Sequence, residues 1–332
     1  MSLHDRIVVI DSLQVGGDWP QEVIDDIRAS GLTAVGVTSV VWEDSKQALS
    51  DIGLWNRRFR KHPDVFLPVR IGADILRAKR EGRTGVIYGF QNASPFEDTL
   101  DYVEIFGTLG VKVCQLTYNN QNSLGGSCYE AHDSGLSRFG RNVVREMNRV
   151  GMIVDLSHVG EQTSLDAIEH STRPVAVTHG NPTFIHPHKR NKSEKVLTAL
   201  RERGGMIGFT PYPNLSGIGT TLVQWCDQVK RVVAFMGIDR VGIGSDMARG
   251  WADFPGHVNW VRMGTWTHEI DYGAGTPGRP WGYEPFPDWF AKAAEFRNLT
   301  EGLLANGFNE TEVTAIMGGN WLRFFSEGFE PE

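Results

Sequence analysis

The sequence lacks long apolar runs and paired cysteines. No hydrophobic stretch approaches the roughly 20 residues of a transmembrane helix, and the first residues, MSLHDRIVVIDSL, contain no basic segment followed by an apolar core. We therefore expect neither a signal peptide nor a membrane partner. The three cysteines, Cys114, Cys128 and Cys226, lie far apart and include no C-x-x-C pattern. Free thiols in a reducing cytoplasm are the expected state.

An excess of positive charge is absent too. Lys and Arg number 33 against 40 Asp and Glu, which gives a formal net charge of −7. This balance argues against nucleic acid as the main partner, because phosphate backbones attract basic surfaces. The G-x-G-x-x-G pattern of a dinucleotide site is missing after every predicted strand, which disfavours that class of enzyme.

What the chain does contain is a regular alternation of short β-branched runs and amphipathic stretches. Eight such strand–helix units without a dividing linker predict one domain over residues 1–332. They favour a closed (β/α)8 TIM-type barrel over an open doubly wound sheet. The predicted strands are 7–10, 33–41, 84–90, 111–118, 151–159, 174–180, 206–212 and 241–243. The predicted helices are 20–30, 51–62, 73–81, 96–109, 137–150, 161–171, 193–203, 222–236, 288–306 and 310–325.

The stretch 249–285 interrupts this alternation. It is rich in Trp, Gly, Pro and His and follows the last predicted strand. A long loop at this point predicts a cover over the barrel mouth, since long loops in compact domains are usually functional. A surface elaboration or a subunit contact in a homodimer explains the composition equally well, so both interpretations stay open.

Two histidines mark the ends of consecutive predicted strands. The fifth strand ends in DLSHV with His158, and the sixth ends in VTHG with His179. Because parallel barrel strands share one carboxyl edge, both imidazoles are expected at the edge where ligands bind. Two converging imidazoles could hold a transition metal such as Zn²⁺, whereas a lone histidine would more often be a polar strand cap.

The succession VDLSHV, VTHGN, KRN, GIGSD and GGNWLRFF resembles, in its order and spacing, the renal (membrane) dipeptidase family of zinc hydrolases. The likeness extends over most of the chain, from about residue 7 to residue 325. It implies a (β/α)8 barrel with two bridged zinc ions. It also implies hydrolysis of dipeptides, including some with a D-residue at the carboxyl end.

Four residues match the family's site. His158 and His179 correspond to the histidines of its second metal, and Asp246 to the aspartate that binds the first metal and takes part in proton transfer. Arg190 corresponds to the arginine that holds the substrate carboxylate, and Asn191 beside it is a further candidate for substrate binding. Without the resemblance, the stretch HPHKRN would be interpreted as a solvated basic loop.

Other positions depart from the family. Its first strand ends Asp-Gly-His-x-Asp, whereas this chain has Asp11-Ser-Leu13-Gln-Val15, and neither Leu13 nor Val15 can ligate a metal. The bridging glutamate falls on Gln91, a neutral amide that cannot neutralise two cations and is a candidate for substrate binding instead. The family histidine that polarises the scissile carbonyl is Tyr118 here, whose hydroxyl can donate to a developing oxyanion.

These matches predict a dipeptidase-like hydrolase with at most one metal, zinc or another divalent ion, held by His158, His179 and Asp246. If Asp246 is not a ligand, it would act as general base and then as acid for the leaving amine. The substrate would be a small molecule with a carboxylate. Two alternatives stay open: a metal-independent lyase, isomerase or decarboxylase acting on a small acid, and a non-catalytic binding homologue. We interpret Asp155 as structural, because strand alternation turns it away from the His158 face.

Overall fold

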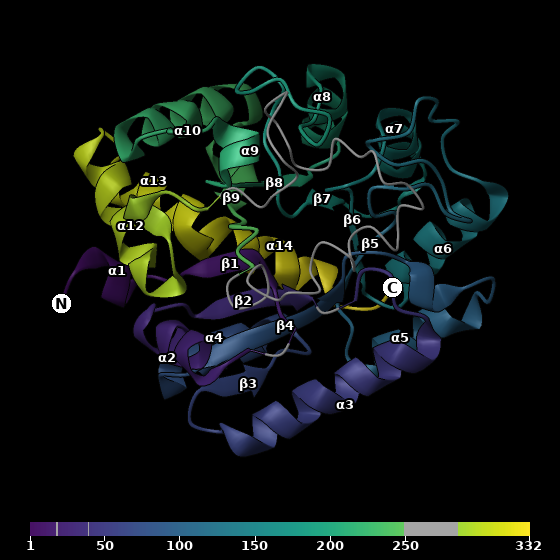
Figure 1. Cartoon of the computed structure of the whole chain (residues 1–332), viewed down its shortest axis with the longest axis horizontal. Helices are drawn as coiled ribbons and strands as arrows, with labels where there is room; N and C mark the ends of the chain where they lie inside the picture. The colour runs from purple at the N-terminus through teal and green to yellow at the C-terminus, as the bar shows by residue number, and fades with distance from the viewer. Residues whose placement is uncertain (18, 39, 249–284) are drawn as a thin grey trace.

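Parallel strands close into a barrel in the computed structural model, which describes residues 1–17, 19–38, 40–248 and 285–332 (Figure 1). The barrel strands are β1 (Ile10–Val15), β2 (Ala34–Thr38), β4 (Thr84–Phe90), β5 (Val113–Gln115), β6 (Ile153–Asp155), β7 (Ala176–Val177), β8 (Met206–Phe209) and β9 (Val241–Ile243). They follow one another in chain order around the barrel, β2 pairing directly with β4. Asp11 of β1 pairs with Ile243 of β9 and closes the ring. The predicted eight-stranded TIM-type barrel is confirmed.

The strands differ from the prediction in two places. A short additional strand, β3 (Phe66–Pro68), pairs with the start of β4; it is missing from the prediction because three residues ending in proline carry no alternating pattern. The first strand begins at Ile10 and not at residue 7, so Asp11 lies inside it. Polar side chains are tolerated in this buried strand because they are hydrogen-bonded: Gln14 donates to Asp11, and the Ser12 hydroxyl donates to the carbonyl oxygens of Ile243 on β9 and of Thr178, which follows β7.

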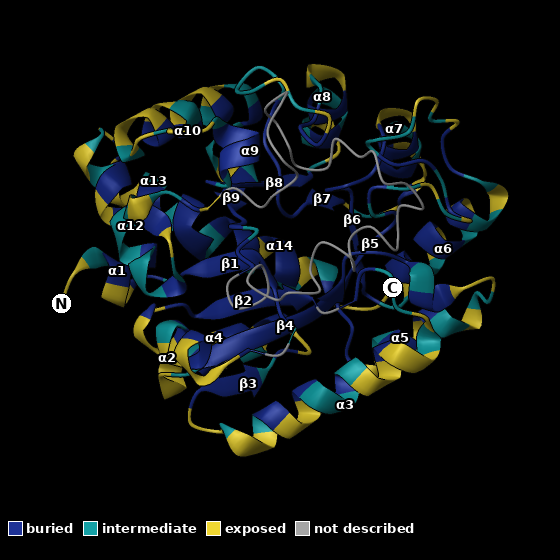
Figure 2. Ribbon diagram, in the orientation of Figure 1, coloured by how far each residue is buried: buried dark blue, intermediate teal, exposed yellow. Residues whose placement is uncertain are grey.

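The helices form the outer layer of the barrel. They are α1 (Leu3–Arg6), α2 (Gln21–Ala29), α3 (Ser45–Lys61), α4 (Gly72–Glu81), α5 (Asp101–Leu109), α6 (Arg138–Arg149), α7 (Glu161–His170), α8 (Glu194–Glu202), α9 (Pro213–Ser216), α10 (Leu222–Met236), α12 (Phe296–Ala305), α13 (Glu310–Thr314) and α14 (Asn320–Gly328). Side-chain caps begin several of them; Asp44 caps α3 and Thr221 caps α10 through backbone N–H groups of the first turn. Figure 2 shows the barrel strands buried and the outer helices exposed along one side.

The two last predicted helices are subdivided. The region 288–306 starts with two 3-10 turns, Asp288–Phe290 and Ala293–Glu295, before α12 begins. The region 310–325 consists of α13, a π-helical turn at Ala315–Gly319, and α14. The turn brings the backbone against the start of the first strand, since a Cβ on Gly318 would lie 2.5 Å from the carbonyl oxygen of Val8 and 2.9 Å from the backbone nitrogen of Ile10. The predicted loop over 249–285 lies outside the described residues except for Pro285.

Helix α14 closes the barrel interior at the amino ends of the strands. Trp321 is fully buried there among apolar strand residues such as Ile10 and Ile87. Its indole N–H donates to the carbonyl oxygen of Ile243 at 3.0 Å. The indole lies so close to β9 that a Cβ on Gly242 would stand 2.2 Å from Nε1. This packing leaves the opposite, carboxyl edge of the strands for the predicted site.

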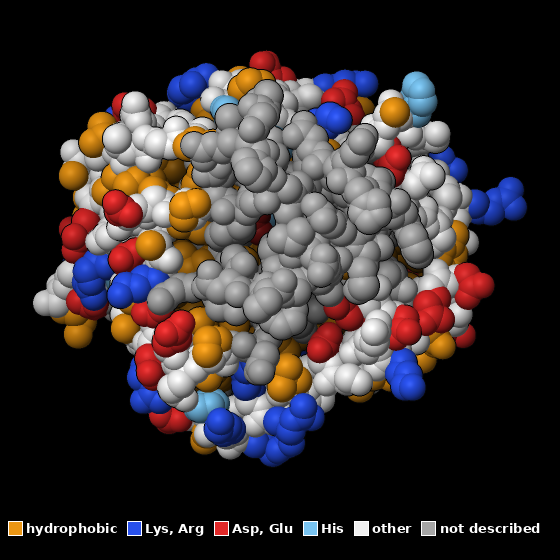
Figure 3. Space-filling view, in the orientation of Figure 1, with side chains coloured by type: hydrophobic (Ala, Val, Ile, Leu, Met, Phe, Trp, Pro, Cys, Tyr) orange, Lys and Arg blue, Asp and Glu red, His pale blue; other side chains and the backbone are white. Residues whose placement is uncertain are grey.

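The surface carries mixed charge. On the face shown in Figure 3, described Lys and Arg side chains are interspersed with Asp and Glu. No helix among the described residues has the length and apolar character needed to cross a bilayer.

Candidate active site

His158 and His179 meet at the carboxyl edge of the barrel. His158 follows β6 and His179 follows β7, and their Nε2 atoms lie 3.1 Å apart. The ring centroids are 5.2 Å apart with planes inclined by 54°. His158 is 5% exposed and His179 is fully buried. Burial is the main cause that holds the pKa of both imidazoles well below the ordinary value, and the positive charges of Arg190 and Lys192 act in the same direction.

The outer nitrogen of each imidazole has its own partner. Nδ1 of His158 lies 2.6 Å from Oδ1 of Asn119, and Nδ1 of His179 lies 2.9 Å from the hydroxyl of Thr178. Thr178 in turn donates to Asp155 at 2.6 Å. Burial raises the pKa of Asp155, while hydrogen bonds from Ser157 and Thr178 oppose this rise. Asp155 is therefore linked to the His179 side of the site through Thr178, a connection that strand alternation alone did not indicate.

Asp246 and Gln91 complete the edge around His179. Asp246 follows β9, and its Oδ1 lies 3.9 Å from Nε2 of His179; Gln91 follows β4, and its side-chain nitrogen lies 3.1 Å from the same atom. Asp246 has a φ of 59°, a left-handed conformation that aspartate tolerates better than most residues. Burial raises the pKa of Asp246 to about 7, although Arg190 opposes the rise.

Tyr118 packs against the imidazole of His158. Its ring stacks on His158, with centroids 4.1 Å apart and planes inclined by 26°, and the indole of Trp42 packs edge-on against it. Burial is the main cause that raises the pKa of the Tyr118 phenol far above its ordinary value. The hydroxyl therefore stays protonated and can serve as a hydrogen-bond donor.

Besides Gln91, the residues predicted to bind substrate are Arg190 and Asn191, and they differ in how they are held. The guanidinium of Arg190 donates to the carbonyl oxygens of Ser157 and, at 3.4 Å, of His179. It is therefore bonded to the backbone beside both histidines. The Asn191 amide nitrogen donates to the carbonyl oxygens of His186 and Leu215. These bonds occupy both amide N–H groups, so Asn191 supports the loop that carries Arg190, and its contact with substrate stays a prediction.

Three consecutive carbonyl oxygens on the turn after β6 are held by three different groups. Arg190 binds that of Ser157, the backbone N–H of Cys128 binds that of His158 at 3.0 Å, and Nζ of Lys192 binds that of Val159 at 2.6 Å. Lys192 is only 4% exposed, and burial lowers its pKa to about 7. Lys192 is not predictable from the sequence, since its position two residues after Arg190 is its one local signal and suggests a solvated basic loop.

The end of the first strand is apolar where the family carries metal ligands. Leu13 and Val15 are buried side chains of β1. Asp11, the remaining carboxylate, accepts hydrogen bonds from Gln14 at 2.8 Å and from the hydroxyl of Ser245 at 2.6 Å. Its contacts thus lie within the strands, and it fixes the end of β9, which leads into Asp246.

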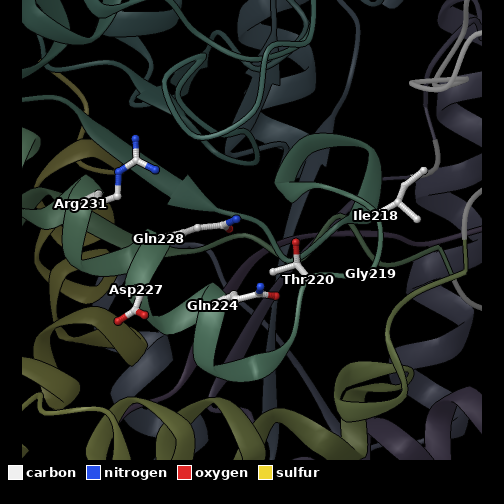
Figure 4. A pocket seen from close by; sticks show the side chains of 7 residues that line it. All are labelled: Ile218, Gly219, Thr220, Gln224, Asp227, Gln228 and Arg231. Atoms are coloured by element: carbon white, nitrogen blue, oxygen red, sulfur yellow. The ribbon is translucent and has the colours of Figure 1, made fainter.

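A hollow lies at the start of α10, apart from the predicted site residues (Figure 4). It has a volume of about 370 Å³ and is open and polar. Gln224 and Gln228 of α10 point toward the short loop that holds Gly219 and Thr220, and Arg231 of the same helix also lines the hollow. None of the seven lining residues belongs to the histidine site.

Comparison with known proteins identifies the family. The sequence profile of the membrane dipeptidases (peptidase family M19) matches residues 20–262. The chain belongs to the membrane dipeptidase family. Members of this family are typically zinc metallopeptidases. The resemblance stated from the sequence motifs is thereby confirmed.

Individual relatives extend the comparison. Dipeptidase tcpJ of Claviceps purpurea is 29% identical over 85% of this chain, and dipeptidase aclJ of Aspergillus oryzae is 26% identical over 87%. The chain spans 60% and 62% of the lengths of these two relatives. A crystal structure of an amidohydrolase from Pseudomonas aeruginosa is 38% identical, with a TM-score of 0.90 and 98% of each chain covered.

Two imidazole nitrogens at the barrel edge could bind one ion of the zinc type. Two bonds of about 2.0–2.1 Å to a common ion can span the 3.1 Å between the imidazole nitrogens, and imidazole suits zinc. Within the described residues, no group of three or more His, Cys, Asp or Glu side chains is spaced to hold a metal, so further oxygen donors would have to move closer. A second ion at the end of the first strand would meet Leu13 and Val15, which do not fit it.

Proposed function

We propose that this protein is a dipeptidase-like hydrolase that cleaves an amide bond in a small substrate carrying a carboxylate. The observation that carries the proposal is the meeting of His158, His179 and Asp246 at one barrel edge, with Arg190 behind them, in a chain of the membrane dipeptidase family. We further propose that His158 and His179 hold at most one divalent ion. The chemistry that such an ion would supply is polarisation of the scissile carbonyl and acidification of water.

The chain's own residues then have separate tasks. Asp246 takes a proton from the attacking water and returns it to the leaving amine, a role that suits a carboxyl group with a pKa near neutrality. Tyr118 donates its hydroxyl proton in a hydrogen bond to the oxygen that gains negative charge. Arg190 binds the substrate carboxylate with the N–H groups that do not contact the backbone.

The metal-independent alternative keeps support from one observation. The side-chain nitrogen of Gln91 lies at hydrogen-bonding distance from Nε2 of His179, so a neutral amide occupies the position next to that imidazole. In this alternative the two histidines, Asp246 and Tyr118 are acid–base groups acting on a small acid.

One experiment separates these functions. The full chain is purified without a histidine tag, treated with a chelator, and assayed on dipeptides with either an L- or a D-residue at the carboxyl end. We expect hydrolysis to disappear on chelation and to return with one equivalent of Zn²⁺, Mn²⁺ or Co²⁺. Hydrolysis that survives chelation would refute the metal-dependent hydrolase, and an absence of hydrolysis with or without metal would favour the metal-independent enzyme acting on a small acid or the non-catalytic binding homologue.

Asp246→Asn provides the matched test of acid–base chemistry. We expect a loss of turnover of about 100-fold or more, the range typical of a removed general base. Asp239→Asn, an exposed carboxylate close by in the sequence, should leave turnover unchanged. Equal turnover in Asp246→Asn and the parent protein would exclude this role.

The free cysteines and the charge of the protein support proposals on its location and its partners. All three cysteines are free, with Cys114 and Cys226 buried, which supports a reducing compartment such as the cytoplasm. The mixed surface charge and the formal net charge of −7 agree with a small-molecule substrate and no nucleic-acid partner.

A further inference from the structure

The side chain of Asn119 lies behind His158, on the side away from His179. Asn119 belongs to the loop after β5, is 2% exposed, and has a φ of 57°, in the left-handed region that asparagine tolerates. Its Oδ1 atom lies 2.6 Å from Nδ1 of His158. The thiol of Cys128 lies 3.8 Å from the same oxygen and donates to it. Two donors therefore converge on one carboxamide oxygen.

This oxygen decides which nitrogen of His158 carries the proton. A carboxamide oxygen has lone pairs and no hydrogen, so the hydrogen in the bond to Asn119 must come from Nδ1. A neutral imidazole has a single N–H, and Nε2 of His158 consequently presents a lone pair. The Cys128 thiol donates to the same oxygen, which agrees with this orientation of the amide.

His179 has the same proton arrangement for a different reason. The Thr178 hydroxyl gives its only hydrogen to Asp155, so it accepts the hydrogen on Nδ1 of His179. The side-chain nitrogen of Gln91 points at Nε2 of His179, which agrees with a lone pair there. Both Nε2 atoms thus present lone pairs to each other across 3.1 Å, with no hydrogen between them.

We propose that Asn119 is a positioning residue that fixes His158 in the Nδ1–H tautomer and so directs the Nε2 lone pair to the shared point between the two imidazoles. The consequence for metal binding rests on the proposed function, whereas the tautomer is a property of the metal-free chain. Groups that orient a metal-ligating histidine typically change metal affinity about 10- to 100-fold when removed.

The test is a long-range ¹H–¹⁵N NMR spectrum of the metal-free full chain labelled at histidine nitrogens. We expect pyrrole-type Nδ1 and pyridine-type Nε2 signals for both His158 and His179. Asn119→Gly removes the acceptor and keeps the left-handed backbone accessible; His158 should then populate the other tautomer while His179 stays unchanged. Asn119→Asp restores the acceptor and should restore the parent pattern. Zinc affinity, measured by competition with a chelator, should fall about 10- to 100-fold in Asn119→Gly and recover in Asn119→Asp.

Asn122→Ala is the control for a general loosening of the loop. Asn122 holds the carbonyl of Leu116 and the backbone N–H of Leu124 in the same loop, so its loss should leave the His158 tautomer unchanged. An Nε2–H signal for His158 in the parent protein would overturn the proposal without any variant. An unchanged tautomer in Asn119→Gly would overturn it too. A tautomer that responds as expected in a chain that binds no zinc would support the positioning role and refute the metal-dependent function.

Discussion

The ring of Tyr118 covers the imidazole of His158 as a near-parallel stack at 4.1 Å. The phenol is thus fixed by a contact that involves its ring face and not its hydroxyl. The two contributions of this side chain, packing and hydrogen bonding, can be separated by substitution.

We expect Tyr118→Phe to keep the stack and to lose the oxyanion contact. Turnover should fall about 10- to 100-fold, somewhat less than for removal of a dedicated oxyanion donor, while KM and the free energy of unfolding stay close to the parent values. Steady-state kinetics and urea unfolding measure these quantities. Tyr102→Phe, on α5 and distant in sequence, is the control. Unchanged turnover in Tyr118→Phe would remove the hydroxyl from the mechanism.

Arg190→Lys should raise KM for a carboxylated substrate about tenfold or more, because a point charge cannot replace a bidentate fork. Arg201→Lys is the matched control, since Arg201 also donates to a backbone carbonyl, that of Phe235, and lies outside the site. If both variants lose only stability and keep the same KM, Arg190 acts as a backbone clamp alone.

Metal content should be at most one ion per chain. Elemental analysis of the tag-free protein tests this, and His158→Gln or His179→Gln should remove the ion. His170→Gln, on α7 and bonded through Nδ1 to its own helix, should keep it. Two ions per chain, both needed for catalysis, would show that another residue replaces the ligands absent at Leu13 and Val15.

Acid should destabilise the fold partly through His4. This side chain is buried, hydrogen-bonded to Thr300 and to the carbonyl oxygen of Ser30, and burial lowers its pKa below 6.5. The unfolded chain therefore binds the proton more tightly, so the contribution of His4 is complete above about pH 6.5 and is lost as the pH falls toward the folded pKa. Urea unfolding at several pH values should show a flatter acid limb for His4→Gln, and an equally steep limb would contradict this assignment.

Two glycine substitutions should have opposite effects. Gly242→Ala should destabilise by more than about 2 kcal/mol, because the new methyl group would overlap the indole of Trp321. Gly53→Ala, inside α3 with only Arg57 within 4 Å, should stabilise by about 0.5–1 kcal/mol. Thermal and urea unfolding measure both, and a neutral Gly242→Ala would show that Trp321 can move aside.

The barrel could be predicted from sequence because its strands are short apolar runs separated by amphipathic helices. The meeting of His158 and His179 followed from their equivalent places at strand ends, and the structure brings them to 3.1 Å. The strand β3 was not predicted, because its three residues are too few to show an alternation of apolar and polar side chains. The first strand was misplaced because the polar residues of Asp11-Ser-Leu-Gln resemble a loop until their partners on neighbouring strands are known.

The supporting residues of the site could not be predicted. Asn119 and Lys192 are polar residues in polar loops, and only the folded structure shows that both are buried. Asn119 contacts the imidazole of His158, and Lys192 binds the carbonyl oxygen of Val159. Asp155 could be assigned to a strand, yet its link to His179 passes through Thr178, directly after the next strand. Contacts of this kind join residues that are distant in sequence, so no local pattern indicates them.

The hydrogen bonds to three consecutive carbonyl oxygens on the turn after β6 have a consequence for ligand binding. Arg190, Lys192 and the backbone N–H of Cys128 order this turn when the chain folds. The conformational entropy of about 1–2 kcal/mol per ordered residue is therefore lost during folding and not on encounter with a ligand. His158 is preorganised, so a ligand should meet a rigid surface. Amide hydrogen exchange at Cys128 should accordingly be slow in the free protein and almost unchanged in the complex.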